Sequence, residues 1–138
     1  MITLIVGKKG SGKTKKLIER ANEAVKTSDG NVIVIEKGLK LTYDISHQAR
    51  LVDSDAYGIK GSDALYGFVS GICAGNYDVT DIFIDSTLKI IGSDPETLKE
   101  YAEKMNVLSQ QAGVKITQLV SHTADELPEG VKAVAEII

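Results

Sequence analysis

Eight residues near the start of the chain, Gly7 to Thr14, have types and spacing suited to holding an anion. They read Gly-Lys-Lys-Gly-Ser-Gly-Lys-Thr. Glycine lets the backbone adopt turns in which several main-chain N–H groups point at one anion. The lysine and threonine that end the run supply a cation for phosphate oxygens and a hydroxyl ligand for Mg²⁺. The spacing therefore predicts a cradle for a polyphosphate and its metal ion.

The elements on either side of this loop suit that chemistry. The apolar run Ile2 to Val6 predicts a parallel strand buried on both faces. From Thr14 to about Lys26, apolar residues recur at helical spacing. A loop between such a strand and helix would hold an anion at the positive end of the helix dipole. The apolar run Val32 to Ile35 then completes a strand, helix, strand unit.

The loop matches the whole G-x-x-x-x-G-K-[ST] pattern, and the chain here resembles the P-loop nucleoside triphosphatase superfamily. The resemblance implies that Lys13 contacts the β- and γ-phosphates and that the Thr14 hydroxyl ligates Mg²⁺. The phosphate-binding residues would be Gly7, Lys8, Lys9, Gly10, Ser11, Gly12, Lys13, Thr14 and Lys15. The alternative is a glycine-rich turn with solvated lysines, which is the better interpretation of Lys8 and Lys9 taken alone.

Asp85 closes the run Asp81-Ile82-Phe83-Ile84-Asp85, which resembles the Walker B segment of that superfamily. We expect Asp85 at the carboxyl end of a strand next to the phosphate-loop strand, where its carboxylate would support Mg²⁺. The alternative is an aspartate that only caps the following turn. Asp81 begins the same strand, about 13 Å away, and should lie at the opposite end of the sheet.

Ser86 follows Asp85. Many members of the additional-strand branch, which includes RecA-like and AAA-type proteins, carry a glutamate there that polarises water. A serine cannot act as a carboxylate base near neutral pH, so slow turnover or borrowed catalysis is implied. Glu36, expected at the carboxyl end of the second strand, is the best substitute for positioning water, with a solvated strand-end carboxylate as the alternative. Asp53 is a weaker candidate.

Two further polar positions could act on the transferred phosphate. The only arginines are Arg20, expected on a solvated helix face, and Arg50. Arg50 is therefore the candidate for stabilising transition-state charge, in cis or from a neighbouring subunit, although an ordinary surface role is favoured. Ser121 and His122 follow a late apolar strand, where related ATPases place a polar sensor of the γ-phosphate. A structural histidine is the alternative.

The rest of the chain alternates apolar strand runs with amphipathic helix patterns. Ser62 is expected to cap a helix ending near Gly75, and Ser93 with Glu96 predicts a capping box for a helix ending before Gly113. Residues 128–138 form a last element, helix or edge strand. The pattern predicts one P-loop domain over residues 1–138, a three-layer α/β/α fold with a mainly parallel sheet of about five strands.

Composition narrows the class of protein. The 138 residues are 43% apolar and 25% charged with a net charge of −3, which is typical of a globular chain without a broad positive field for nucleic acid. The single cysteine, Cys73, excludes an intrachain disulfide and suits a reducing cytoplasm. No apolar run approaches the ~20 residues of a membrane span. We expect a cytoplasmic protein without a membrane span.

Sequence motifs distinguish the competing functions. A regulatory GTPase is disfavoured for two reasons. Asp85 is followed by Ser86-Thr87-Leu88, which does not match the D-x-x-G pattern, and no N-K-x-D motif occurs. A small-molecule kinase would usually add an arginine-bearing lid. Some small bacterial P-loop proteins similar to this chain are labelled twitching-motility-type ATPases. We expect an ATP-binding protein with Mg²⁺ and slow or partner-stimulated hydrolysis; the alternative is a nucleotide-gated binding or assembly module, with a protein partner or a homo-oligomer.

Overall fold

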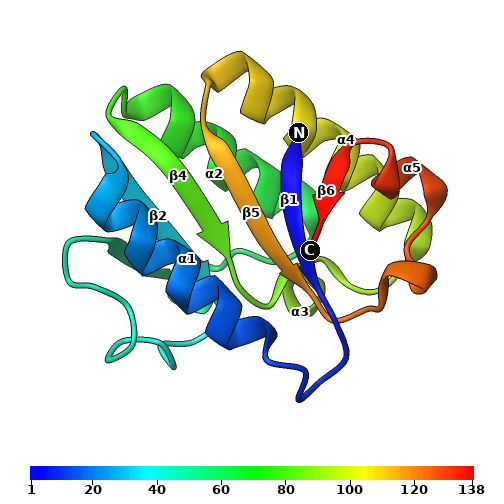
Figure 1. The fold of residues 1–138 in the computed structure, drawn as a ribbon. Helices are drawn as coiled ribbons and strands as arrows, with labels where there is room; N and C mark the ends of the chain where they lie inside the picture. Colours follow the sequence, from blue (N-terminus) through cyan, green and yellow to red (C-terminus); the bar gives the residue numbers. More distant parts are fainter.

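The computed structural model describes residues 1–138 and contains one six-stranded sheet (Figure 1). All neighbouring strands pair in parallel, in the order β3-β2-β4-β5-β1-β6. The strands are β1 (Ile2–Val6), β2 (Asn31–Glu36), β3 (Arg50–Asp53), β4 (Val79–Ile84), β5 (Lys115–Val120) and β6 (Ala135–Ile137). The four central strands carry the β-branched apolar runs that favour a sheet buried on both faces.

Helices cover both faces of this sheet. Helix α1 (Lys13–Thr27) packs on one face, and the other helices pack on the opposite face (Figure 1). That second group is α2 (Ser62–Gly75), α3 (Thr87–Ile91), α4 (Pro95–Ala112) and α5 (Glu129–Lys132), with short 3₁₀ turns at Asp55–Tyr57 and Ala124–Glu126. The expected three-layer α/β/α fold is confirmed.

The sheet has six strands where about five were expected, because the last element is a helix and a strand in succession. Residues 129–132 form α5, and β6 then pairs with β1 through Ile2 opposite Ala135 and Leu4 opposite Ile137. A four-residue helix and a three-residue strand are too short to show a periodic pattern. Only pairing with β1 decides what these residues become.

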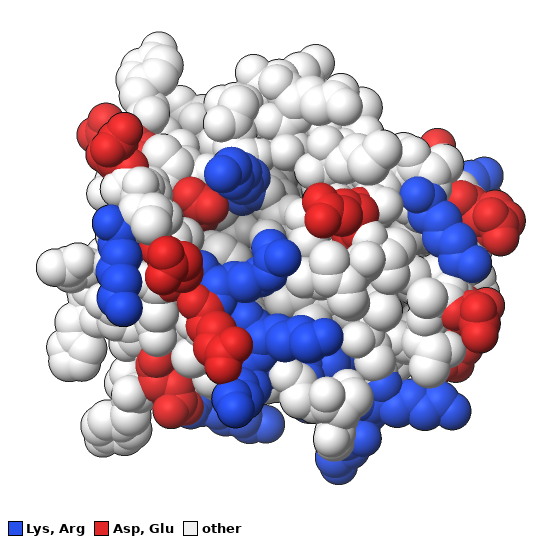
Figure 2. Space-filling model, in the orientation of Figure 1, with Lys and Arg blue, Asp and Glu red and all other residues white.

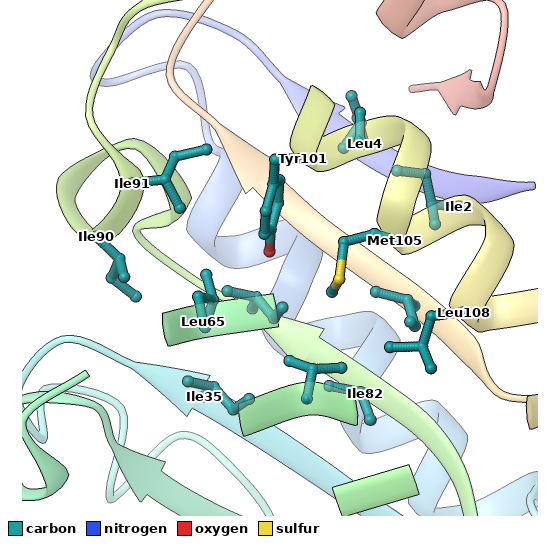
Figure 3. Packing of buried hydrophobic residues seen from close by; sticks show 14 of the residues in the cluster. Ile2, Leu4, Ile35, Leu65, Ile82, Ile90, Ile91, Tyr101, Met105 and Leu108 are labelled. Atoms are coloured by element: carbon teal, nitrogen blue, oxygen red, sulfur yellow. The ribbon is translucent and has the colours of Figure 1, made fainter. Parts of the chain in front are cut away.

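The larger of two apolar clusters lies between the sheet and helices α2 and α4. Tyr101, Met105 and Leu108 project from α4 onto the sheet, where Figure 3 shows them beside residues of β1 and β4. Met105 is fully buried, and the Tyr101 hydroxyl donates a 2.7 Å hydrogen bond to Oε1 of buried Gln118. Burial raises the pKa of Tyr101 far above its ordinary range, so the phenol stays neutral.

Several helix ends differ from the sequence-based expectation. Asp94, not Ser93, caps α4: its carboxylate accepts a 2.9 Å hydrogen bond from the Thr97 amide. Pro95 is then the first helical residue, which suits its fixed φ. Ser62 likewise lies inside α2 without a capping bond, and α1 begins at Lys13, one residue earlier than expected.

No helix in the structure has both the length and the apolar character needed to cross a membrane.

Candidate functional site

The Gly7–Thr14 loop joins the carboxyl end of β1 to the amino end of α1. Gly7, at φ +148°, has a backbone conformation that L side chains rarely adopt, and a Cβ there would also meet the Ser11 side chain. Gly12 takes a left-handed conformation, φ +87°, immediately before α1. Both positions therefore need glycine for the backbone to curl back on itself.

Lys13 closes the loop. The residue is only 8% exposed, and its Nζ donates a 3.2 Å hydrogen bond to the Lys8 carbonyl oxygen at the far side of the loop. The Ser11 amide donates to the same carbonyl at 3.1 Å. The ammonium is thus folded over the loop rather than extended into solvent.

No group of the chain itself compensates the partial positive charge at the amino end of α1. Its cap is Gly12, no side chain caps its first amides, and no acidic residue lies in its first turn. Free amides and the positive end of the dipole make this end receptive to an anion. Lys8, Lys9 and Lys15 are exposed around it, and Figure 2 shows basic side chains gathered on the lower part of this face.

His122, just after β5, lies beside the loop through its backbone. The Gly7 amide donates a 2.7 Å hydrogen bond to the His122 carbonyl oxygen. The imidazole Nδ1 is 3.8 Å from Glu126 Oε2. Glu126 also accepts hydrogen bonds from the backbone and hydroxyl of Thr123, which lower its pKa. The structure therefore places the His122 backbone against the loop and its side chain beside Glu126, whereas Ser121 is exposed.

Asp85 lies at the carboxyl end of β4, at the same edge of the sheet as the loop. The expectation that its strand neighbours the loop strand is wrong, because β5 lies between β4 and β1. Two inter-strand spacings amount to about 10 Å, a gap that phosphates with a hydrated cation can span. Thr14 is exposed in the first turn of α1. Asp81 lies at the other end of the sheet, opposite Lys115, as expected.

Ser86 has the backbone conformation φ 58°, ψ 34°, the only positive φ at a residue other than glycine. Its hydroxyl donates a 3.3 Å hydrogen bond to Asp85 Oδ2. A left-handed serine is energetically unfavourable and is characteristic of functional sites. Here the strain lies in the residue that follows the candidate metal-supporting carboxylate.

Glu36 ends β2, as expected, but the alternative of a solvated carboxylate is wrong. The residue is 1% exposed, and its carboxylate accepts hydrogen bonds from the Lys40 amide at 2.6 Å and the Leu41 amide at 3.2 Å. Burial raises the pKa of Glu36, as do the charges of Asp85 and Asp53, while the two amide bonds lower it. Glu36 therefore anchors the loop after β2, and both its oxygens are already engaged.

Asp53 anchors the neighbouring turn in the same way. Its Oδ1 accepts hydrogen bonds from the Gly38 amide at 2.8 Å and from the Asp55 amide at 3.0 Å. The loop after β2 is also tied to α1 by Asn22, whose side chain bonds the Asp44 carbonyl and the Ser46 amide. No sequence pattern marks Asn22, because its partners lie more than twenty residues away.

Arg50 lies far from the loop. It is exposed at the amino end of edge strand β3, and β2, β4 and β5 separate β3 from β1. Four inter-strand spacings come to about 19 Å, in addition to the length of the strand. The interpretation of Arg50 as a catalytic arginine in cis is therefore wrong. A role from a neighbouring subunit stays a prediction.

A hollow of about 760 Å³ in the surface does not include the loop. It lies toward the amino ends of the strands, between the second half of α1 and the sheet, with Arg20, Glu23, Asp81 and Lys115 among its lining residues. No residue from Gly7 to Thr14 lines it. The candidate site is thus an exposed loop at the carboxyl edge of the sheet.

A scan against models of protein families and a search of curated proteins both found no match.

Proposed function

We propose that the chain binds the phosphates of ATP with Mg²⁺ at the Gly7–Thr14 loop and hydrolyses ATP slowly or only with a partner. The protein would belong with the additional-strand branch of the P-loop nucleoside triphosphatases, in a reducing cytoplasm. The observation that carries this proposal is the closed loop. Lys13 is folded over the glycine-rich loop, at a helix end that no side chain caps.

The strand order supports the same assignment. In this sheet β5 lies between the loop strand β1 and the strand that ends in Asp85. A strand inserted at that place is the feature after which the additional-strand branch is named. Thr14 would ligate Mg²⁺ directly, and Asp85 would hold the water shell of the ion across the gap.

The residues around the phosphates support slow chemistry. Ser86 occupies the position of the usual glutamate, and the carboxylate of Glu36 is bound to two backbone amides. Neither group offers a free base for a water molecule. Without a base or an arginine, the loop would position the triphosphate and neutralise its charge but supply little further acceleration.

Glu36 also favours a second candidate function, a nucleotide-gated binding module. Its carboxylate accepts hydrogen bonds from the loop after β2, which exposes Leu39 and Tyr43, and it is repelled by the charge of Asp85 at the nucleotide edge. A cation that neutralised Asp85 would remove one repulsive charge from Glu36 and so tighten that loop. Binding would then change a surface even if hydrolysis were incidental.

The test is titration calorimetry with ATP, GTP and ADP, each with and without Mg²⁺. Lys13→Ala removes a charge-assisted contact of about 1.5–3 kcal/mol, so ATP affinity should fall about tenfold to a hundredfold. Lys26→Ala, at an exposed lysine in the last turn of the same helix, is the matched control and should bind like the wild type. Equal affinity in the Lys13 and Lys26 variants would refute the loop assignment.

Asp85→Asn tests the metal site separately, because it should reduce the gain in affinity that Mg²⁺ provides and leave metal-free binding nearly unchanged.

Phosphate release, measured on the same samples, distinguishes the two candidate functions. Efficient multiple turnover by the isolated chain would contradict slow hydrolysis. A nucleotide-dependent change in amide exchange at residues 37–45 without turnover would favour the binding module.

A further inference from the structure

An apolar groove of about 380 Å³ opens beside the free edge of the sheet, between α2 and strand β3. Its lining residues are Ile33, Arg50, Val52, Tyr57, Phe68, Gly71, Ile72, Gly75 and Asn76. Phe68 and Ile72 are only partly buried, and Tyr57 is 64% exposed. The groove thus leaves part of the apolar surface of Phe68, Ile72 and Tyr57 open to solvent.

The strand that borders the groove has backbone groups available for pairing. β3 pairs with β2 alone and ends the sheet on that side. A free strand edge presents N–H and C=O groups that can pair with a strand of another molecule. The four residues of β3 are enough for a short ladder and bring the partner's chain next to the groove.

Helix α2 presents backbone to the same side. Gly67, Gly71 and Gly75 are spaced four apart and exposed, and a Cβ at any of them would meet no atom within 4 Å. None of them has a positive φ. Glycine inside a helix is unfavourable relative to alanine, and nothing within the chain requires it here. Close approach of a second helix would account for it.

The charges on β3 indicate what kind of partner fits. Arg50, at the amino end, takes part in no ion pair. Asp53 and Asp55 lie at and just beyond the carboxyl end, where Lys37 already pairs with Asp55 at 2.7 Å and Asp53 has no cationic partner. Two copies of this strand running antiparallel would bring each Arg50 toward the acidic end of the other. Opposite charges then meet at both ends of the ladder, as two-fold symmetry requires.

We propose that this edge is a self-association surface, occupied by a second copy of the chain. The two β3 strands pair antiparallel about a two-fold axis perpendicular to the sheet, which makes one continuous sheet across both copies. Both α2 helices then lie on the same face, their glycines allow close packing, and the two grooves join into one apolar interface. Arg50 contacts the partner's acidic turn and remains remote from either Gly7–Thr14 loop, so this interface is independent of nucleotide binding.

Sedimentation equilibrium of the full chain over about 0.01–1 mM tests the proposal, since dissociation constants across this range correspond to about 4–7 kcal/mol. We expect a monomer–dimer equilibrium. Arg50→Glu should weaken it at least about tenfold, and adding Asp55→Arg to that variant should restore most of the affinity. Arg20→Glu makes the same charge change at an exposed position on α1 and should leave the equilibrium unchanged.

Gly71→Leu tests the helix contact without charge. Its side chain would enter open space in the monomer, so the variant should fold and melt at least as high as the wild type, while its dimer is lost. A chain that stays monomeric up to 1 mM overturns the proposal. So does a dimer whose dissociation constant is the same in the Arg50→Glu and Gly71→Leu variants as in the wild type.

Discussion

Two charged side chains at the carboxyl edge of the sheet are buried in different ways. Lys13 reaches a single carbonyl across a loop of glycines, and a phosphate group arriving at that loop would compete for its ammonium. Glu36 is held by two amides of its own chain and has acidic neighbours, Asp53 and Asp85. At the scale of the residue, the Lys13 ammonium can exchange its carbonyl partner for a phosphate. The Glu36 carboxylate is held in place, and its protonation is sensitive to nearby charge.

The raised pKa of Glu36 predicts how stability varies with pH. Because burial raises this pKa above the ordinary value of 4.5, native Glu36 binds its proton more tightly than the unfolded chain does. The native state then holds more protons in the window between the two pKa values, so the free energy of unfolding falls as pH rises through it.

Urea denaturation of the wild type and Glu36→Gln between about pH 4 and pH 7 measures this contribution. The glutamine variant lacks this titration. The free energy of unfolding of the wild type, taken relative to that of the variant, should therefore fall as pH rises above 4.5 and then become constant. A difference that rises with pH over this range would mean that the amide bonds outweigh burial and that the assigned cause is wrong.

At the scale of the element, the start of α4 depends on one carboxylate. Asp94 Oδ2 accepts hydrogen bonds from the Thr97 amide at 2.9 Å and from the Thr97 hydroxyl at 3.0 Å. These bonds lower the pKa of Asp94 below its ordinary 3.8. The helix that this residue caps supplies Met105 and Tyr101 to the core, so the cap affects more than local order.

Asp94→Ala should lower the melting temperature at neutral pH, whereas Asp94→Asn, which also caps well, should lower it less. Since the pKa is lowered in the native state, the carboxylate's contribution is present above pH 3.8 and is lost as pH falls through the lowered pKa. Thermal melts of the three proteins at neutral and acidic pH check both points. An equal loss in the alanine and asparagine variants would show that the side chain does not act as a cap.

At the scale of the whole molecule, one helix packs against elements that are distant from one another in the sequence. Helix α4 packs against α2 and also against strands β1 and β5, and its side chains meet residues from both ends of the chain. In Figure 3, Met105 lies between Ile2 and Leu4 of β1 and Ile82 of β4. Loss of packing here should weaken the global fold rather than one local segment.

Met105→Ala should therefore reduce the free energy of unfolding by about 2–5 kcal/mol, because the residue is fully buried and a cavity would remain. Val107→Ala, on the same helix at a residue 49% exposed, is the control and should change stability by less than about 0.5 kcal/mol. Chemical denaturation with matched m-values is the measurement. Similar losses of unfolding free energy in both variants would mean that α4 does not pack against the core through Met105.

The long elements could be predicted because each carries its own pattern. The apolar runs around Ile5, Val34 and Phe83 form central strands of the sheet. The helical spacing of Leu98, Met105 and Leu108 corresponds to the buried face of α4. Short elements such as α3, α5 and β6 could not be predicted, because three to five residues hold no period. The expected cap at Ser93 and the candidate role of Arg50 as a catalytic arginine in cis were wrong, because a cap depends on the path of the loop and a catalytic contact depends on strand order.

The amino-acid sequence by itself determined the α/β class, the main strands and the glycine loop, because backbone preferences and periodicity act over neighbouring residues. Tertiary structure alone decided that β5 lies between β1 and β4, that Glu36 is buried against Lys40 and Leu41, and that Arg50 lies at a free edge. Those outcomes depend on contacts between residues that pairing and packing bring together, and no local window of the chain contains them.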